Sequence, residues 1–183
     1  MKKHARFLPD SRWVRYDKTT QLWIPNRKRI YLYWYKFLQL ALVDGLTPVR
    51  WCAYKGWGTP ADILSQPFDA WWDERWVDLF GYPEGGQPKF SLSTSRPKTD
   101  AIRYAYLVHI HKGRGDNWEI AQYIQKRETS KRGIPVPSFA YATEGVVYGA
   151  EDKLTVQSRV GRYKQMAQQI IDNVRDGTFP GKS

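Results

Sequence analysis

The stretch from Thr155 to Val174 constrains the fold more than any other part of this chain. Apolar side chains recur there every three or four residues, which is the period of one face of an α-helix: Val156, Val160, Tyr163, Ala167, Ile170, Ile171 and Val174. A seam of this length must be covered by other elements of the protein. The spacing therefore predicts a long helix over residues 155–174 and a mainly α-helical fold around it.

Helical spacing appears again earlier in the chain. It predicts helices over residues 27–43, 68–80 and 100–111. Asn26 is expected to cap the first of these helices, and Gly45 is expected to end it in a left-handed turn. Helices are therefore expected in both halves of the chain.

Two short polar patterns mark further helix starts. Thr59 precedes Pro60 and lies three residues before Asp62, while Asp116 lies three residues before Glu119. In each pattern the first side chain can accept from the third helical N–H, and the later carboxylate can reach back to the first residue. Both patterns therefore predict capped N-termini.

One β-hairpin is expected near the N-terminus. Residues 12–16 and 21–24 are rich in aromatic and β-branched side chains, and residues 17–20 between them are polar. The predicted fold class is thus mainly α with a small β-hairpin: a Trp-rich N-terminal helical lobe and a second helical lobe that contains an inserted loop.

Aromatic residues dominate the front half of the chain. Eight of the nine tryptophans precede residue 77. Large rings most often build a core, but they also stack on bases or bind partners at a surface. A buried aromatic core is the favoured interpretation.

The lobes are expected to divide at residues 82–97. This stretch holds three prolines, three serines and two adjacent glycines, a linker-like composition that is long for a loop inside one compact domain. The predicted lobes cover residues 1–90 and 98–183.

Charge and cysteine content narrow the classes of protein. The formal net charge is +11, distributed as +9 over residues 1–58, −3 over 59–97 and +5 over 98–183. A single cysteine excludes an intrachain disulfide and a multi-thiolate zinc site, so a cytoplasmic location is expected. No signal peptide, membrane-spanning segment or cofactor motif is recognised.

The second lobe resembles the broad helix-turn-helix class over roughly residues 99–175. A helix, a glycine turn at residues 113–115 and a capped helix with the small Ala121 follow one another as in a tri-helical DNA-binding unit. The third helix, 155–174, would then be the recognition helix. An insert over 127–153 departs from the usual short turn, and its basic start, residues 126–133, is predicted to be a mobile loop that either contacts phosphates or is simply solvated.

Double-stranded DNA is the partner that this resemblance and the charge imply. Candidate base-reading residues on the third helix are Gln157, Ser158, Arg159, Arg162 and Lys164. Candidate phosphate contacts in the basic run are Lys126, Arg127, Lys131 and Arg132. The cluster Arg27, Lys28 and Arg29 lies in the first turn of a helix, where the dipole disfavours cations, so either a phosphate or solvent compensates it.

The sequence-based hypothesis is a sequence-reading DNA-binding protein that regulates transcription or DNA maintenance. The main alternative is a protein-interaction or assembly factor acting through exposed rings of Trp34, Trp71, Trp72 or Trp76. RNA binding is a variant that exposed Trp13, Tyr16 and Trp23 would favour. A homodimer contact could use the seam at Ile170, Ile171 and Val174.

An enzyme is not expected. A nuclease would be the least unlikely activity, since His109, His111, Asp116 and Glu119 lie within eleven residues. The two histidines face different sides of a helix, however, and both acids are already assigned to a capping pattern.

Overall fold

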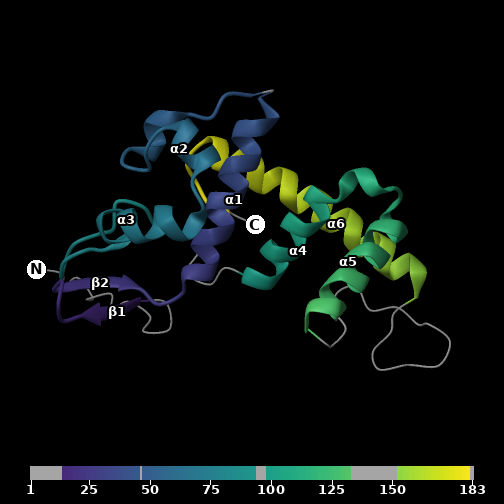
Figure 1. Ribbon diagram of the computed structural model, residues 1–183, viewed down its shortest axis with the longest axis horizontal. Coiled ribbons are helices and arrows are strands. Elements are labelled where there is room, and N and C mark those ends of the chain that lie inside the picture. Colours follow the sequence, from purple (N-terminus) through teal and green to yellow (C-terminus); the bar gives the residue numbers. More distant parts are fainter. Residues whose placement is uncertain (1–13, 46, 94–97, 133–151, 182–183) are drawn as a thin grey trace, which may run out of the picture. The chain divides into compact units, whose positions relative to one another are not determined.

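The computed structural model describes residues 14–45, 47–93, 98–132 and 152–181. These residues form six α-helices, two short 3-10 helices and one two-stranded antiparallel sheet (Figure 1). The prediction of a mainly α fold with a small hairpin is confirmed. Backbone packing divides the chain into a first unit, Met1–Pro97 with Asn173–Ser183, and a second unit, Lys98–Asp172.

The first unit contains the hairpin and three α-helices. Its elements are β1 (Val14–Asp17), β2 (Leu22–Pro25), α1 (Lys28–Asp44), η1 (Trp51–Tyr54), α2 (Pro60–Ser65) and α3 (Phe68–Phe80). The second unit contains α4 (Thr99–Ile110), η2 (Lys112–Arg114), α5 (Asn117–Arg132) and most of α6 (Lys153–Arg175).

The hairpin forms where the sequence predicts it, although residues 12 and 13 of its first arm lie outside the described residues. Val14 pairs with Pro25 and Asp17 with Leu22. The Asp17 carboxylate accepts hydrogen bonds from the Thr20 backbone N–H at 3.0 Å and from the Thr20 hydroxyl at 2.6 Å. These bonds close the turn and hold the pKa of Asp17 below its usual value.

The first predicted helix is confirmed as α1, but its start differs from the prediction. Gly45 ends the helix with φ 61°, as expected. Asn26 is not the cap, because the N-cap position is Arg27, whose side chain forms no capping hydrogen bond. The Asn26 amide instead donates to the Val14 carbonyl oxygen at 3.5 Å, which joins the hairpin to the entry of the helix.

The capping pattern before α2 is confirmed in full. The Thr59 hydroxyl accepts from the Asp62 N–H at 3.2 Å, and the Asp62 carboxylate accepts from the Thr59 N–H at 2.7 Å. Helix α3 also matches its predicted range, 68–80, and ends at Gly81. Local sequence signals therefore locate the start of α2 and the end of α3.

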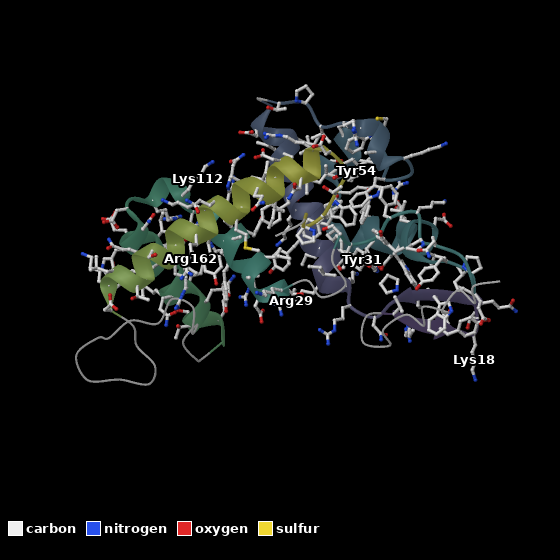
Figure 2. All side chains as sticks on the ribbon, turned by 180° about the vertical axis from the view of Figure 1, so that it is seen from behind. Lys18, Arg29, Tyr31, Tyr54, Lys112 and Arg162 are labelled. Carbon is white, nitrogen blue, oxygen red and sulfur yellow. The ribbon has the colours of Figure 1, made fainter. Side chains whose placement is uncertain are left out.

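Aromatic rings fill the interior of the first unit, gathered around the positions of Tyr31 and Tyr54 in Figure 2. Trp34, Trp57 and Trp71 are fully buried. The centroids of their indole rings lie 5.3 Å apart for Trp34 and Trp57 and 4.7 Å apart for Trp57 and Trp71. The core interpretation is thus confirmed for these tryptophans.

Two buried polar side chains of this core, those of Trp34 and Tyr54, are hydrogen-bonded to each other. The Trp34 indole N–H donates to the Tyr54 hydroxyl at 3.3 Å, and that hydroxyl donates to the Val174 carbonyl oxygen at 2.5 Å. Burial is the main reason that the pKa of Tyr54 is raised. The hydroxyl therefore remains a donor and ties η1 to the end of α6.

The proline- and glycine-rich stretch after α3 packs on the first unit as far as residue 93. Tyr82 exchanges two backbone hydrogen bonds with Trp23 at 2.8 and 3.1 Å, and the Phe90 N–H donates to the Leu79 carbonyl at 3.1 Å. Residues 173–181, which the predicted second lobe included, also belong to the first unit. The Ser93 N–H, for example, donates to the Phe179 carbonyl at 2.8 Å.

The basic run at residues 126–132 was predicted to be a loop, and that prediction is wrong. Helix α5 continues to Arg132. Lys, Arg and Glu, which make up most of this run, are good helix formers, and the Ser130 hydroxyl donates to the Lys126 carbonyl at 2.8 Å. Glu128 is also buried against Arg103 of α4, which anchors this part of the helix. The rest of the predicted insert, residues 133–151, lies outside the described residues.

The length and hydropathy of a helix decide whether it can cross a membrane. Within the described ranges, no helix combines the length and the apolar content needed to span a bilayer.

Candidate nucleic-acid interface

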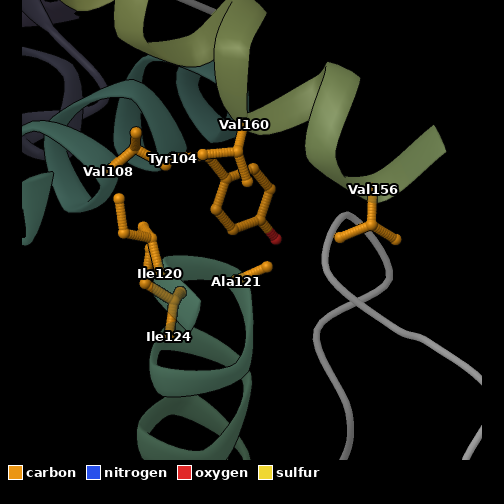
Figure 3. Packing of buried hydrophobic residues seen from close by; sticks show 7 residues of the cluster. All are labelled: Tyr104, Val108, Ile120, Ala121, Ile124, Val156 and Val160. Carbon is orange, nitrogen blue, oxygen red and sulfur yellow. The ribbon is translucent and has the colours of Figure 1, made fainter. Parts of the chain in front are cut away.

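Three helices of the second unit enclose one apolar core (Figure 3). Helix α4 contributes Tyr104 and Val108, and α6 contributes Val156 and Val160. The contribution of α5 is Ile120, Ala121 and Ile124, of which Ala121 is fully buried. One face of the N-terminal half of α6 is therefore fixed to the other two helices.

The start of α5 is built by the predicted capping box. The Asp116 carboxylate accepts from the Glu119 N–H at 2.9 Å, and the Glu119 carboxylate accepts from the Asp116 N–H at 2.8 Å. Gly115 precedes it with φ 124°, and a Cβ atom there would lie 1.7 Å from the Glu119 carboxylate. The capping box therefore requires a glycine at position 115.

Two contacts position the first turns of α6. The Asp152 carboxylate accepts from the Thr155 N–H at 2.9 Å and from the Thr155 hydroxyl at 2.7 Å, which lowers the pKa of Asp152. The Asn117 amide of α5 donates to the Gln157 carbonyl oxygen at 3.1 Å. The α6 terminus is therefore capped locally and tied to α5.

The five candidate base-reading residues do not form one narrow face. At about 100° per residue, Ser158 and Arg162 lie opposite the buried side chains of Val156 and Val160, and both are exposed. Arg159 lies on one flank of the helix. Gln157 and Lys164 lie on the other flank, and all three flanking residues are partly buried.

Two glutamines extend the outward face, and the sequence reasoning missed them. Gln165 and Gln169 are exposed and follow Arg162 at spacings of three and seven residues. The same periodicity that identified the apolar seam could have identified them on the opposite side. We call Ser158, Arg162, Gln165 and Gln169 the outward strip.

Gly161 lies in the first half of α6 and leaves the helix surface there without a side chain. In the protein itself nothing requires a glycine, because a Cβ atom at this position would lie 3.6 Å from the Asn117 amide nitrogen, an ordinary contact.

We therefore expect Gly161→Ala to raise the free energy of unfolding by up to about 1 kcal/mol through helix propensity. Urea denaturation followed by circular dichroism measures this change. A loss of stability would mean that α6 packs more tightly against α5 at this residue than the contact distance indicates.

On α5, the predicted phosphate contacts lie on a helix surface. Lys126, Arg127 and Lys131 are exposed. Arg127 and Lys131 are one turn apart and so share a face. Arg132 is the last residue of the helix, and its side chain lies outside the described residues.

The basic triplet at the start of α1 has an explanation within the first unit. Lys28 pairs with Asp69 at 2.6 Å and with Asp73 at 3.6 Å on α3. Its ammonium nitrogen also lies 5.5 Å from the centre of the Phe68 ring. Carboxylates of α3 therefore compensate the charge of Lys28. The sequence had suggested only a phosphate or solvent for this role.

The other two members of the triplet, Arg27 and Arg29, are exposed at the start of α1. They belong to the first unit, whereas the outward strip and the exposed bases of α5 belong to the second. The triplet is therefore left out of the candidate interface.

The residues considered for a nuclease metal site have other contacts. Asp116 and Glu119 form the capping box, and His111 is buried against the Tyr123 ring with centroids 4.7 Å apart. Among the residues that the structure describes, no three His, Cys, Asp or Glu side chains are grouped to hold a metal ion.

The tryptophans that the interaction hypothesis needs at a surface lie inside the first unit. Trp34 and Trp71 are fully buried and Trp72 is 6% exposed. Trp76 is partly buried and stacks on Trp72 with ring centroids 6.0 Å apart. The expected exposed patch is therefore not formed by these residues.

Comparisons with known proteins assign no family to this chain, so its own residues and their geometry are the basis for proposing a function. Neither a protein-family model, nor a curated protein, nor a solved structure matches this chain.

Proposed function

We propose that this protein binds double-stranded DNA and reads its sequence through the outward strip of α6, as a cytoplasmic regulator of transcription or DNA maintenance. One observation carries the proposal: the strip lies on the side of α6 opposite the side chains that anchor this helix to α4 and α5. A helix held in this way can enter a major groove with its polar side chains first.

The chemistry of the strip suits base edges. Arginine pairs with the two acceptors of guanine, and glutamine pairs with the acceptor and donor of adenine. Arg162 is flanked by Ser158 on one turn and Gln165 on the next. The strip therefore offers both kinds of reading group in one line.

Charge supports the same partner. The chain carries 29 basic and 18 acidic residues, and a duplex presents about one negative charge per 1.7 Å of its axis. Lys126, Arg127 and Lys131 of α5 provide exposed cations in the same unit as the strip. Such residues suit phosphate contacts, which position a protein without reading sequence.

Dimerisation through the apolar seam is not part of the proposal. Ile170, Ile171 and Val174 are each at most 2% exposed within this chain. They are therefore not offered to a second copy.

Replacing Arg162 and Arg159 together with alanine should weaken binding to the preferred sequence by a few kcal/mol at most, because a good base contact is worth about 1–3 kcal/mol. Lys131→Ala should instead weaken binding to every duplex alike. Titration of a selected and a scrambled duplex measures both effects, with Lys55→Ala in the first unit as the charge-matched control for Lys131→Ala. Unchanged affinity of the double variant for the selected duplex would exclude α6 as the reading helix.

A further inference from the structure

A second group of cations lies where η2 meets α5, and the interface described above does not use most of it. The Arg114 guanidinium lies 3.9 Å from the centre of the Tyr123 ring. Arg127 Nη1 lies 3.4 Å from His111 Nε2 and 3.5 Å from the Tyr123 hydroxyl oxygen. Two guanidinium groups and an imidazole thus lie around the side chain of Tyr123. We call Arg114, Tyr123, Arg127 and His111 the Tyr123 cluster.

Among the residues that the structure describes, no carboxylate belongs to the Tyr123 cluster. In the part of the chain that the structure describes, Arg114 and Arg127 form no ion pair with a carboxylate, and the neighbouring Lys112 forms none either. Other cations of this protein do have such partners, as Lys28 has Asp69 and Arg103 has Glu128. The nearby acids Asp116 and Glu119 bond to each other's backbone in the capping box.

His111 responds to this positive environment. It is only 7% exposed. Burial first, then the charges of Arg127 and Arg114, lower the pKa of His111. The neutral imidazole can accept from Arg127, and the groups facing it are Tyr123 and Arg127 from α5 and Arg114 from η2.

The hydrogen bonds inside the Tyr123 cluster are long. Their separations of 3.4 and 3.5 Å exceed the usual 2.7–3.2 Å for N–H donors. Converging donors with weak mutual bonds are suited to an oxyanion, since an arginine can offer two parallel N–H groups and a tyrosine can add its O–H.

We propose that Arg114, Tyr123 and Arg127, together with His111, form a binding site for a phosphate group. The phosphate would accept from Arg127 and Tyr123 and would neutralise Arg114. Its negative charge would also favour the imidazolium form of His111, which then donates through Nε2. The chemistry is shared by a nucleic-acid backbone and by a free phosphate compound, and it does not depend on base reading by α6.

The test follows the imidazole signals of the full chain by NMR during titration with inorganic pyrophosphate at constant ionic strength. His111→Gln assigns the His111 signal among the three histidines. We expect saturable shifts of this signal and a rise in the pKa of His111. Arg127→Gln should weaken pyrophosphate binding by about tenfold or more, because bonds to charged groups are the stronger ones. Lys55→Gln, which removes the same charge from an exposed position of the first unit, should leave it unchanged.

A second arm distinguishes the two sources of phosphate. If the site serves a DNA backbone, Arg127→Gln also weakens binding to all duplexes equally and lowers the salt slope by about 1. If it serves a small phosphate compound, duplex binding is unchanged while pyrophosphate binding is lost. Both results support the site. A His111 signal that does not respond to pyrophosphate, or that responds equally in Arg127→Gln with unchanged circular dichroism, overturns it.

Failure of this site and failure of base reading are distinguishable. The pyrophosphate titration contains no DNA, and neither Arg127 nor the control residue Lys55 belongs to the outward strip. Loss of sequence selection with intact pyrophosphate binding would contradict the proposed function only.

Discussion

Replacing Glu128 with alanine should lower the free energy of unfolding of the second unit by about 3–5 kcal/mol. The Glu128 carboxylate pairs with the Arg103 guanidinium, and their side chains are 5% and 10% exposed. Removing the acid takes away the carboxylate that compensates the desolvation of this guanidinium, which has little access to water. Because the pair joins α4 to α5, we expect both helices to lose protection from hydrogen exchange.

A double replacement separates charge pairing from packing. Arg103→Leu with Glu128→Leu removes both charges and keeps apolar volume, and such exchanges are often neutral or stabilising. We therefore expect the double variant to recover most of the loss, measured by urea denaturation and by hydrogen exchange of α5. A single variant as stable as the parent chain would show that the ion pair does not anchor the basic end of α5.

Phe179→Ala should destabilise the first unit by about 3–5 kcal/mol, the usual cost of deleting a buried phenyl ring. Phe179 is fully buried and stacks on Trp34, with centroids 5.4 Å apart and ring planes 14° apart. The centroid of the Phe179 ring also lies 6.3 Å from the centroid of the Phe37 ring. The end of the chain thus completes a core that is otherwise built from residues before 94.

The conservative variant Phe179→Leu serves as the control. It retains most of the volume, so its cost should stay below about 1.5 kcal/mol. Guanidinium unfolding followed by tryptophan fluorescence reports both variants, because Trp34 lies against the replaced ring. If alanine and leucine had the same small effect, the terminal segment would not be part of this core.

Local signals explain why the helices were predictable. The capping boxes at Thr59 and Asp116 are complete within four residues, so their sequence suffices to locate the helix starts. The spacing of Val156 and Val160 likewise identifies a buried face before the neighbouring helices are known. These predictions required no knowledge of tertiary contacts.

The errors arose where distant residues decide. Glu128 looks like one charge in a solvated run until Arg103 of α4 is placed beside it. Lys28 looks uncompensated at a helix start until Asp69 of α3 is found within 2.6 Å. Residues 82–93 read as a linker by composition, yet Tyr82 pairs with Trp23. None of these partners can be inferred from local pattern.

The candidate interface was predictable in part. The sequence located α6, but it placed five residues of this helix in one group because a linear run does not display angular position. The structure separates Arg162 on the outward side from Arg159 and Lys164 on the two flanks. It also adds the exposed side chains of Gln165 and Gln169 to the outward strip. Both residues follow Lys164, the last of the candidates named from the sequence.

The central claim is that this protein reads DNA sequence, and selection of random duplexes by the purified chain tests it most directly. The winning and a scrambled duplex are then titrated at two salt concentrations. We predict an enriched motif whose affinity falls with salt and exceeds that of the scrambled duplex by about 10³-fold or more. No enrichment, with equal salt-sensitive binding to both duplexes, would contradict the claim.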